Sequence, residues 1–585
     1  MLWTPSWNTA REAKDTERRL ALELGGRLLS EYATGISSDL DTAILSANAA
    51  QIVDNIKTKQ PGWTATNVML VFIRSAIEAQ ERSNLLTEIL FNPALKHAQD
   101  LDAEFEKTGK IVGPLHGVPV SLKDQIDLKD VDTTMGQINH PATTDASLVR
   151  TLRRAGAIPF CKTNVPQTML SFECANPLFG ASRNPYDSSR TPGGSSGGEA
   201  GLLGSDGSPM GFGSDVGGSL RIPCHYSGCF ALKPCFGRFP STDCRGTNPG
   251  FEAIKASMGP MGRSVADVEL ASRVVLDASV ELARTEALVP LPYREVKLPR
   301  KLKFGYYLTD GFCHASPACE RAVLETVEAL RKQGHECVEF TPPSPIEAME
   351  LFVALTSAGG YETLLAGLRG DPQEASLWLV TLGPSLPSFV RTSLAWVVEH
   401  VVGDPVLARL FRASRRKSVT EMQAWQEKRW RPRSFVCACV FEILELDAIL
   451  CAPQATPALK HGQTWDLSPA AIGTILYNVV DSSVGLVPVS FVSSTLDAVT
   501  PSWLSTRRAR APVAGSKLAE QRMYGPRGGV YDAKAMEGLP VGVQVVGGHW
   551  DEERVVELMK VVDRALGPRG FGPGEFVKRQ RKKMD

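Results

Sequence analysis

Two glycine- and serine-rich segments are the clearest candidates for chemistry in this sequence. The first covers residues 191–198 (TPGGSSGG) and the second residues 213–219 (GSDVGGS). Paired glycines permit positive φ and close approach of backbone amides, so the turn at Gly217, Gly218 and Ser219 can direct several N–H groups at one point. We therefore expect an anion-binding turn there, suited to a phosphate or to the oxyanion of an acyl-transfer reaction.

Two known motifs come close to these segments. A P-loop closes with Lys-Ser/Thr in G-x-x-x-x-G-K-[ST], and that pair is missing here, which disfavours a nucleotide. Residues 193–197 satisfy the G-x-S-x-G expression of the α/β-hydrolase nucleophile elbow, but an elbow directly follows a strand. The preceding residues 184–192 are turn-rich and do not form that strand. An oxyanion hole is the favoured interpretation.

Lys123 is the candidate base. It ends a segment, residues 116–123, whose alternating apolar residues predict a strand. A Ser/Lys mechanism needs an uncharged lysine, which burial provides by disfavouring the ammonium form. Taken singly, serines beside glycine are usually turn residues and a lysine at a strand end is usually solvated. Only their joint occurrence favours catalysis.

The surrounding elements predict an α/β protein, because strand-like and helical segments alternate. Residues 11–60 and 65–109 have helical periodicity. We expect strands at residues 116–123, 157–161, 302–307, 448–451 and 541–546, and a helix from about Asp551. Large apolar residues interrupt the glycine-rich run, so it is expected to be ordered backbone and not a linker.

Composition narrows the class of protein. The 585 residues are 43% hydrophobic and 22% charged, as in globular proteins, and 64 basic residues balance 64 acidic ones, which argues against a nucleic-acid partner. The 12 cysteines form no C-x-x-C pair, so we expect free thiols and no metal site. Without a signal-like start or about 18 consecutive apolar residues, a cytosolic protein with no spanning helix is expected.

The joint pattern resembles the amidase-signature family, in which a lysine, a serine held by a cis peptide and a nucleophilic serine replace the Ser-His-Asp triad. The matching blocks are residues 117–124, 163–167, 193–199, 213–221, 232–234, 259–263 and 538–544. The resemblance implies Lys123 as base, Ser195 as proton shuttle and Ser219 as nucleophile. It also implies an oxyanion hole from the backbone N–H groups of residues 216–219, which are Val216, Gly217, Gly218 and Ser219.

The same resemblance implies a large twisted mixed β-sheet surrounded by helices, with no cofactor. We expect a single catalytic domain over residues 63–570, a helical segment over residues 1–62 and a basic tail over residues 571–585. Asp215 and Arg221 flank the second segment, and they would either brace it or form a surface ion pair.

Within that family the sequence looks most like the fatty acid amide hydrolases. Residues 167–180, 296–302 and 476–481 carry this similarity, and the first implies an acyl site at Met169, Leu170, Ser171 and Phe172. Two differences stand out: the animal enzymes' N-terminal membrane helix has no counterpart, and Ser482-Ser483 stands where Phe-Pro is expected. A short-chain acetamidase-type enzyme, an amidotransferase subunit and a non-catalytic binding protein remain alternatives.

Residues 384–417 combine apolar and basic side chains. Trp396 and Phe411 lie among leucines and valines, accompanied by five arginines and a lysine. This composition is typical of a helix that lies in the headgroup plane, so we predict reversible peripheral membrane contact. An ordinary core-facing helix pair is the alternative, and Glu399 and Asp404 do not favour an anionic surface.

The expected partner is a small-molecule amide, and a homodimer is left open.

Overall fold

The computed structural model describes residues 7–137, 141–343, 345–368, 370–510, 515–526 and 528–584. The first six residues of the predicted 1–62 segment and the last residue of the predicted 571–585 tail therefore lie outside the described residues.

Eleven strands of the described chain form one mixed sheet. Its order is β1 (Leu86–Ile89), β3 (Ile158–Thr163), β2 (Pro119–Lys123), β6 (Met210–Asp215), β8 (Ser257–Gly262), β7 (Phe230–Lys233), β12 (Val484–Phe491), β13 (Pro540–Val546), β11 (Ala448–Cys451), β9 (Lys303–Tyr306) and β10 (Glu336–Glu339). β3, β2 and β6 are mutually parallel, as are β11, β9 and β10, whereas the strands between β6 and β11 alternate in direction. A separate small hairpin joins β4 (Ala175–Asn176) and β5 (Gly180–Ala181).

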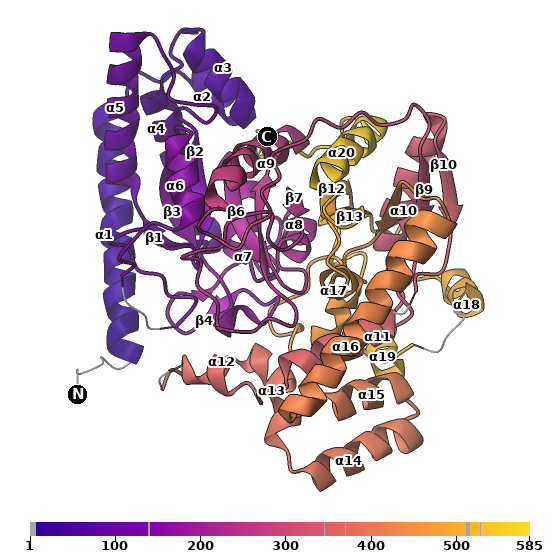
Figure 1. The fold of residues 1–585 in the computed structure, drawn as a ribbon. Helices are drawn as coiled ribbons and strands as arrows, with labels where there is room; N and C mark the ends of the chain where they lie inside the picture. Colours follow the sequence, from indigo (N-terminus) through magenta and orange to yellow (C-terminus); the bar gives the residue numbers. More distant parts are fainter. Residues whose placement is uncertain are drawn as a thin grey trace.

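Five helices precede or flank β1: α1 (Trp7–Tyr32), α2 (Ser38–Ser46), α3 (Ala49–Lys57), α4 (Ala65–Ser83) and α5 (Phe91–Thr108). Of these, α1, α4 and α5 cover the β1 end of the sheet, where Figure 1 shows long helices side by side, whereas α2 packs on α4 and α3 packs on α9 (Val265–Leu282). Ser37 and Asn48 each accept a hydrogen bond from the backbone of the helix that follows, so the predicted helix over residues 11–60 is divided into three. Leu28 and Ile44 share one hydrophobic cluster with Leu122 of β2.

Helices cover both faces of the central strands. α8 (Arg221–Ser227) lies on one face of β12 and β13, and α10 (Pro317–Lys332) and α20 (Glu552–Leu566) lie on the other. Successive side chains of a strand point to opposite faces, so Gln544 of β13 points toward α8 while Val543 and Val545 point toward α20. The remaining helices around the sheet are α6 (Ser147–Arg154), α7 (Gly197–Gly204), α9 (Val265–Leu282), α18 (Pro501–Arg510), α19 (Lys517–Tyr524) and α21 (Glu575–Met584).

A helical cap lies between α8 and solvent, at the lower end of the view in Figure 1. It consists of α11 (Pro345–Thr356), α12 (Glu362–Ala366), α13 (Trp378–Ser385), α14 (Ser388–Val397), a π-helix (Val398–Val402), α15 (Pro405–Ala413), α16 (Val419–Val436), a second π-helix (Cys437–Ile443) and α17 (Ile472–Val479). Short 3₁₀ turns cover Gln167–Met169, Ala375–Leu377 and Ser468–Ala471.

The predicted mixed α/β fold is confirmed, and all five predicted strands are present. Six strands of the sheet were not predicted: β1, β6, β7, β8, β10 and β12. β6 reads MGFGSD, and its glycines hide the alternation by which a strand is recognised. Among the described residues, no helix is long and apolar enough to cross a bilayer. The division at residues 62 and 570 stays a prediction.

Candidate active site

The candidate residues meet where two parallel strands end. β2 and β6 are hydrogen-bonded neighbours, so their carboxyl ends lie at the same edge of the sheet. Lys123 is the last residue of β2, and Ser214 and Asp215 are the last two of β6. Ser195 lies just before α7, whose first turn begins at Gly197. The sheet edge thus brings together segments about 70 to 90 residues apart in the chain.

Lys123 is fully buried, and its Nζ lies 2.7 Å from Ser195 Oγ and 2.9 Å from Ser214 Oγ. The Ser214 hydroxyl in turn donates to Gln125 Oε1. Burial lowers the pKa of Lys123 to about 7, although the carboxylate of Asp215 acts in the opposite direction. A large share of the amine is therefore neutral at physiological pH, the form in which a lysine can accept a proton.

Ser195 and Ser219 come from adjacent segments. The Gly194–Ser195 peptide is cis, and the Ser196 N–H donates to the Ser219 carbonyl at 3.2 Å. The two serines retain 2% and 8% exposure, and both line one cavity next to Ser214. Ser219 therefore lines the cavity, while Ser195 contacts Lys123.

A buried ion pair braces residues 216–219, the candidate catalytic loop. Arg221 Nη2 lies 3.0 Å from Asp215 Oδ1, and neither side chain is exposed, so the surface alternative is wrong. Asp215 also accepts the backbone N–H groups of Gly218 (2.8 Å) and Leu220 (3.0 Å). Burial alone would raise the pKa of Asp215, but the Arg221 guanidinium holds that pKa well below its usual value. Asp215 is thus a fixed anion that orders the loop.

Helix α17 contacts both this ion pair and the loop. Thr474 Oγ1 donates to the Gly217 carbonyl at 2.7 Å, and Asn478 Nδ2 donates to Asp215 Oδ1 at 2.8 Å. Gly218 has a φ of +125°, and a Cβ there would lie 2.3 Å from Thr474 Oγ1. Only glycine adopts this φ readily and has no Cβ that would collide with Thr474. The close packing of the loop against α17 therefore requires glycine at position 218.

Glu199, in the first turn of α7, is a second buried titratable group near Lys123. It is fully buried and accepts hydrogen bonds from Ser121 and from Thr163 Oγ1, the latter at 2.8 Å. Burial raises the pKa of Glu199 to about 7. When Glu199 is ionised, its charge favours the ammonium form of Lys123, so the two groups are electrostatically linked.

A mainly apolar cavity extends from Ser219 into the cap. Its lining includes all four predicted acyl-site residues, Met169, Leu170, Ser171 and Phe172. Helices α11, α13, α15 and α17 add Met349, Phe352, Val353, Leu379, Val380, Leu407, Leu410, Phe411 and Ile475. These cap residues were not predicted, because nothing local in the sequence links them to residues 169–172.

A second cavity reaches Ser219 and Ser195 and has a more polar lining. Gln125, Thr168, Thr247 and Asn248 line it, together with apolar residues such as Phe251. Ser195 and Ser219 therefore both line the mixed cavity, and Ser219 also lines the apolar one.

The cap helix α14 lies within the segment predicted to contact a membrane, and it exposes two aromatic side chains. Phe389 is 73% and Trp396 54% exposed, and both lie on α14, at the outer edge of the molecule in Figure 1. Phe411, however, lines the cavity and does not join this surface. The basic residues are largely neutralised: Arg409, Arg412, Arg415 and Arg416 pair with Glu350, Glu399, Glu421 and Glu362.

The structure thus brings together every predicted site residue around one cavity system. Gln125, Ser214 and Glu199 were not assigned roles from the sequence. Gln125 and Ser214 lie within two residues of positions already singled out, so proximity to Lys123 and Asp215 was the available signal.

The chain as a whole is similar in sequence to known proteins. The Amidase family model matches residues 67–556. Fatty acid amide hydrolase 1 of Caenorhabditis elegans is 33% identical over 523 residues, which cover 86% of this chain and 86% of the relative. Fatty-acid amide hydrolase 1 of Sus scrofa is 33% identical over 548 residues, covering 91% and 88%. An acetamidase of Emericella nidulans is 29% identical over 545 residues, covering 91% and 92%.

A solved structure described as a fatty acid amide hydrolase has the same fold. It aligns with a TM-score of 0.80 and 25% identity, over 97% of this chain and 92% of that one.

Proposed function

Because the chain belongs to the Amidase family, we propose that it hydrolyses fatty acid amides through a relay of Ser219, Ser195 and Lys123. The observation that carries this proposal is the 2.7 Å contact between Ser195 Oγ and the buried Lys123 Nζ, beside an apolar cavity that reaches Ser219. The relatives named fatty acid amide hydrolases support the substrate class.

In the proposed mechanism, neutral Lys123 accepts the Ser195 proton while Ser195 accepts the Ser219 proton. Ser219 Oγ attacks the amide carbonyl, and the oxyanion accepts hydrogen bonds from backbone N–H groups of residues 216–219. Of these, the Gly218 N–H is shared with Asp215. Ser195 then returns a proton to the leaving nitrogen and recovers one from Lys123. Water hydrolyses the acyl-enzyme by the same relay.

The acyl chain is proposed to occupy the cavity lined by Met169, Leu170 and Phe172 and by the cap helices. Burying an apolar chain there is favourable by about 0.8 kcal/mol per CH₂ group. The second, more polar cavity is proposed to receive the leaving amine, since Thr247 and Asn248 offer hydrogen-bonding groups there.

We further propose that the chain attaches reversibly to membranes through the exposed apolar side chains of α14 and the π-helix that follows. Phe389, Trp396 and Val401 are the most exposed of these. Because the neighbouring arginines are paired with glutamates, the attraction is proposed to be mainly hydrophobic. The opposite face of the cap lines the cavity, which supports the entry of an apolar substrate from a lipid phase.

The substrate proposal is tested by comparing kcat/KM for acetamide and for a long-chain primary fatty amide. Preference for the long chain is expected, and Val353→Trp, which fills the cavity, should abolish that preference while acetamide turnover persists. Val338→Trp on β10, at the far edge of the sheet, is the matched control. A wild-type preference for acetamide would assign the chain to the acetamidase-type alternative.

A further inference from the structure

Three loops converge at the edge of the sheet beyond β7, β12 and β13. These strands are neighbours, and β12 runs antiparallel to the other two. The ends of β7 and β13 and the start of β12 therefore lie side by side. Cys235 follows β7 by two residues, Asp481 precedes β12 by three, and His549 follows β13 by three. The topology thus places a thiol, a carboxylate and an imidazole in one small region.

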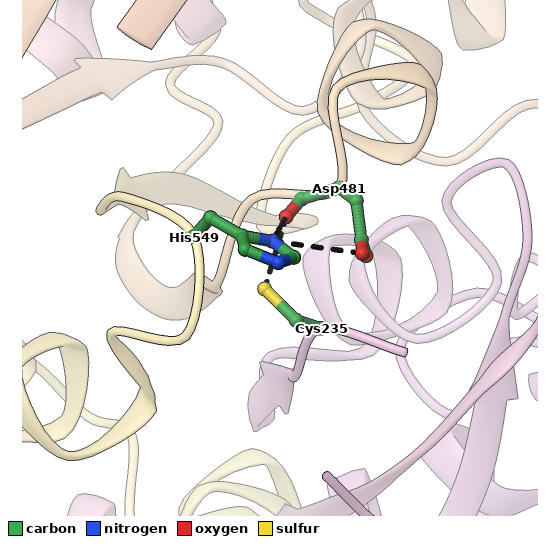
Figure 2. A group of neighbouring side chains, drawn as sticks. All are labelled: Cys235, Asp481 and His549. Atoms are coloured by element: carbon green, nitrogen blue, oxygen red, sulfur yellow. Dashed lines mark hydrogen bonds and ion pairs between the residues drawn. The ribbon is translucent and has the colours of Figure 1, made fainter. Parts of the chain in front are cut away.

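The three side chains face one another, as Figure 2 shows. One ligand-type atom from each of Cys235, Asp481 and His549 lies within 4.8 Å of the others. The Cys235 thiol donates to the Asp481 carbonyl at 2.9 Å, and His549 Nδ1 lies 2.7 Å from the same oxygen. His549 Nδ1 also lies 3.6 Å from Asp481 Oδ2. The thiol, the carboxylate and the imidazole therefore surround one common point.

The surroundings hold these groups in place and keep one side open. The Trp550 N–H donates to Cys235 Sγ at 3.2 Å, and the Phe236 N–H donates to Asp481 Oδ1 at 3.1 Å. Cys235 is buried, whereas the side chains of Asp481 and His549 retain 15% and 20% exposure. The exposed side gives a small ion a path of entry.

We propose that Cys235, Asp481 and His549 bind a borderline-soft divalent cation of the Zn²⁺ type. Thiolate, imidazole and carboxylate are the ligands that Zn²⁺ prefers, and tetrahedral Zn²⁺ places them about 3.3–3.7 Å apart, within reach of small side-chain rotations. Binding displaces the Cys235 proton to solvent, and His549 coordinates through Nδ1 with its proton on Nε2. Cys235 thiolate and Asp481 carboxylate then neutralise the ion, and water fills the fourth position.

This assignment departs from the sequence-based expectation of no metal site. Zinc motifs are recognised by closely spaced ligands, whereas Cys235 and Asp481 are 246 residues apart. The ion would link β7 to the segment after α17, the helix that supports the catalytic loop. Its expected role is therefore structural, because the site is distinct from the cavities at Ser219.

The proposal is tested with the full-length chain, purified without a histidine tag and stripped with a chelator. Titration with Co²⁺ should give one equivalent of tight binding, with the sulfur-to-cobalt charge-transfer band and the visible bands of a tetrahedral site. Cys235→Ser should lose the charge-transfer band, and His549→Gln should weaken binding at least tenfold. Zn²⁺ should displace Co²⁺ and raise the melting temperature of the wild type but not that of Cys235→Ser.

Matched controls are Cys337→Ser on β10 and His400→Gln on the cap, both remote in the fold, which should bind like the wild type. Retention of amide hydrolysis by metal-free Cys235→Ser shows that the variant is folded. Absence of a saturable Co²⁺ site in the wild type would overturn the proposal, as would an unchanged spectrum in Cys235→Ser.

Discussion

Arg221 and Asp215 form a fully buried ion pair behind the catalytic loop, and Arg221 extends the contact to α17 through Asn478 Oδ1 at 2.6 Å and the Thr474 carbonyl at 3.0 Å. Removing the cation leaves the Asp215 carboxylate buried without a charge partner. The pair therefore couples the stability of the fold to the geometry of the loop.

Arg221→Met is expected to lower the free energy of unfolding by about 3–5 kcal/mol and to abolish activity, because an unpaired buried charge is costly. Urea denaturation measures the first effect. Arg19→Met, which breaks an exposed pair with Glu23, should cost less than about 1 kcal/mol. Equal effects of the two changes would contradict a bracing role for Arg221.

Ser219→Ala is expected to abolish amide hydrolysis and labelling by a fluorophosphonate while leaving the melting temperature unchanged. The reason is that the side chain is small and its proposed role is covalent. Activity assays and mass spectrometry of the labelled chain measure the outcome, with Ser171→Ala on the cavity wall as the comparison variant. Turnover near the wild-type rate would remove Ser219 from the mechanism.

The rate should depend on pH through Lys123. Its pKa is about 7, and only the neutral amine accepts a proton, so kcat/KM is expected to rise with pH and level off above about 7. Lys123→Ala should lose about 10²–10⁴-fold in rate. Its remaining activity should climb steeply into alkaline pH as hydroxide replaces the base. The exposed Lys129→Ala is the control; a fully active Lys123→Ala protein would refute the assignment.

Glu199→Gln is expected to move the acid limb of that pH profile to lower pH. The Glu199 carboxylate favours the charged form of Lys123, so its removal should lower the pKa of the amine. A profile of kcat/KM against pH measures the shift, and the exposed Glu106→Gln supplies the control. If the midpoint of the acid limb of kcat/KM stays at the same pH or moves higher, the electrostatic effect of Glu199 on Lys123 is contradicted.

Membrane attachment is expected to depend on α14. Wild-type protein should co-sediment with neutral and anionic liposomes to similar extents, and Phe389→Ser with Trp396→Ser should remain in the supernatant. Leu496→Ser, at an exposed leucine outside the cap, is the control. Wild-type protein that stays in the supernatant with both liposome types would end the attachment proposal.

The sequence alone singled out Lys123, Ser195 and Ser219 and the loop of residues 216–219, whereas Gln125, Ser214 and Glu199 emerged only from the structure. Glycine pairs, the serines beside them and a strand-ending lysine are local features, and backbone freedom at Gly217 and Gly218 is set by the absence of a side chain. The α/β class followed from the alternation of strand-like segments, such as residues 157–161 and 541–546, with helical ones along the chain. β6 was not predicted because its glycines interrupt the alternation of apolar residues. β7 was not predicted because it has only four residues.

Only the tertiary structure decided how these residues behave. The lowered pKa of Lys123 results from burial beneath segments 72 and 91 residues away, and the support of the loop by Asn478 spans 263 residues. Likewise, cap helices supply the outer half of the cavity, and three strand ends bring Cys235, Asp481 and His549 together. Burial and long-range contact depend on how distant segments pack, and no local pattern of residues encodes that packing.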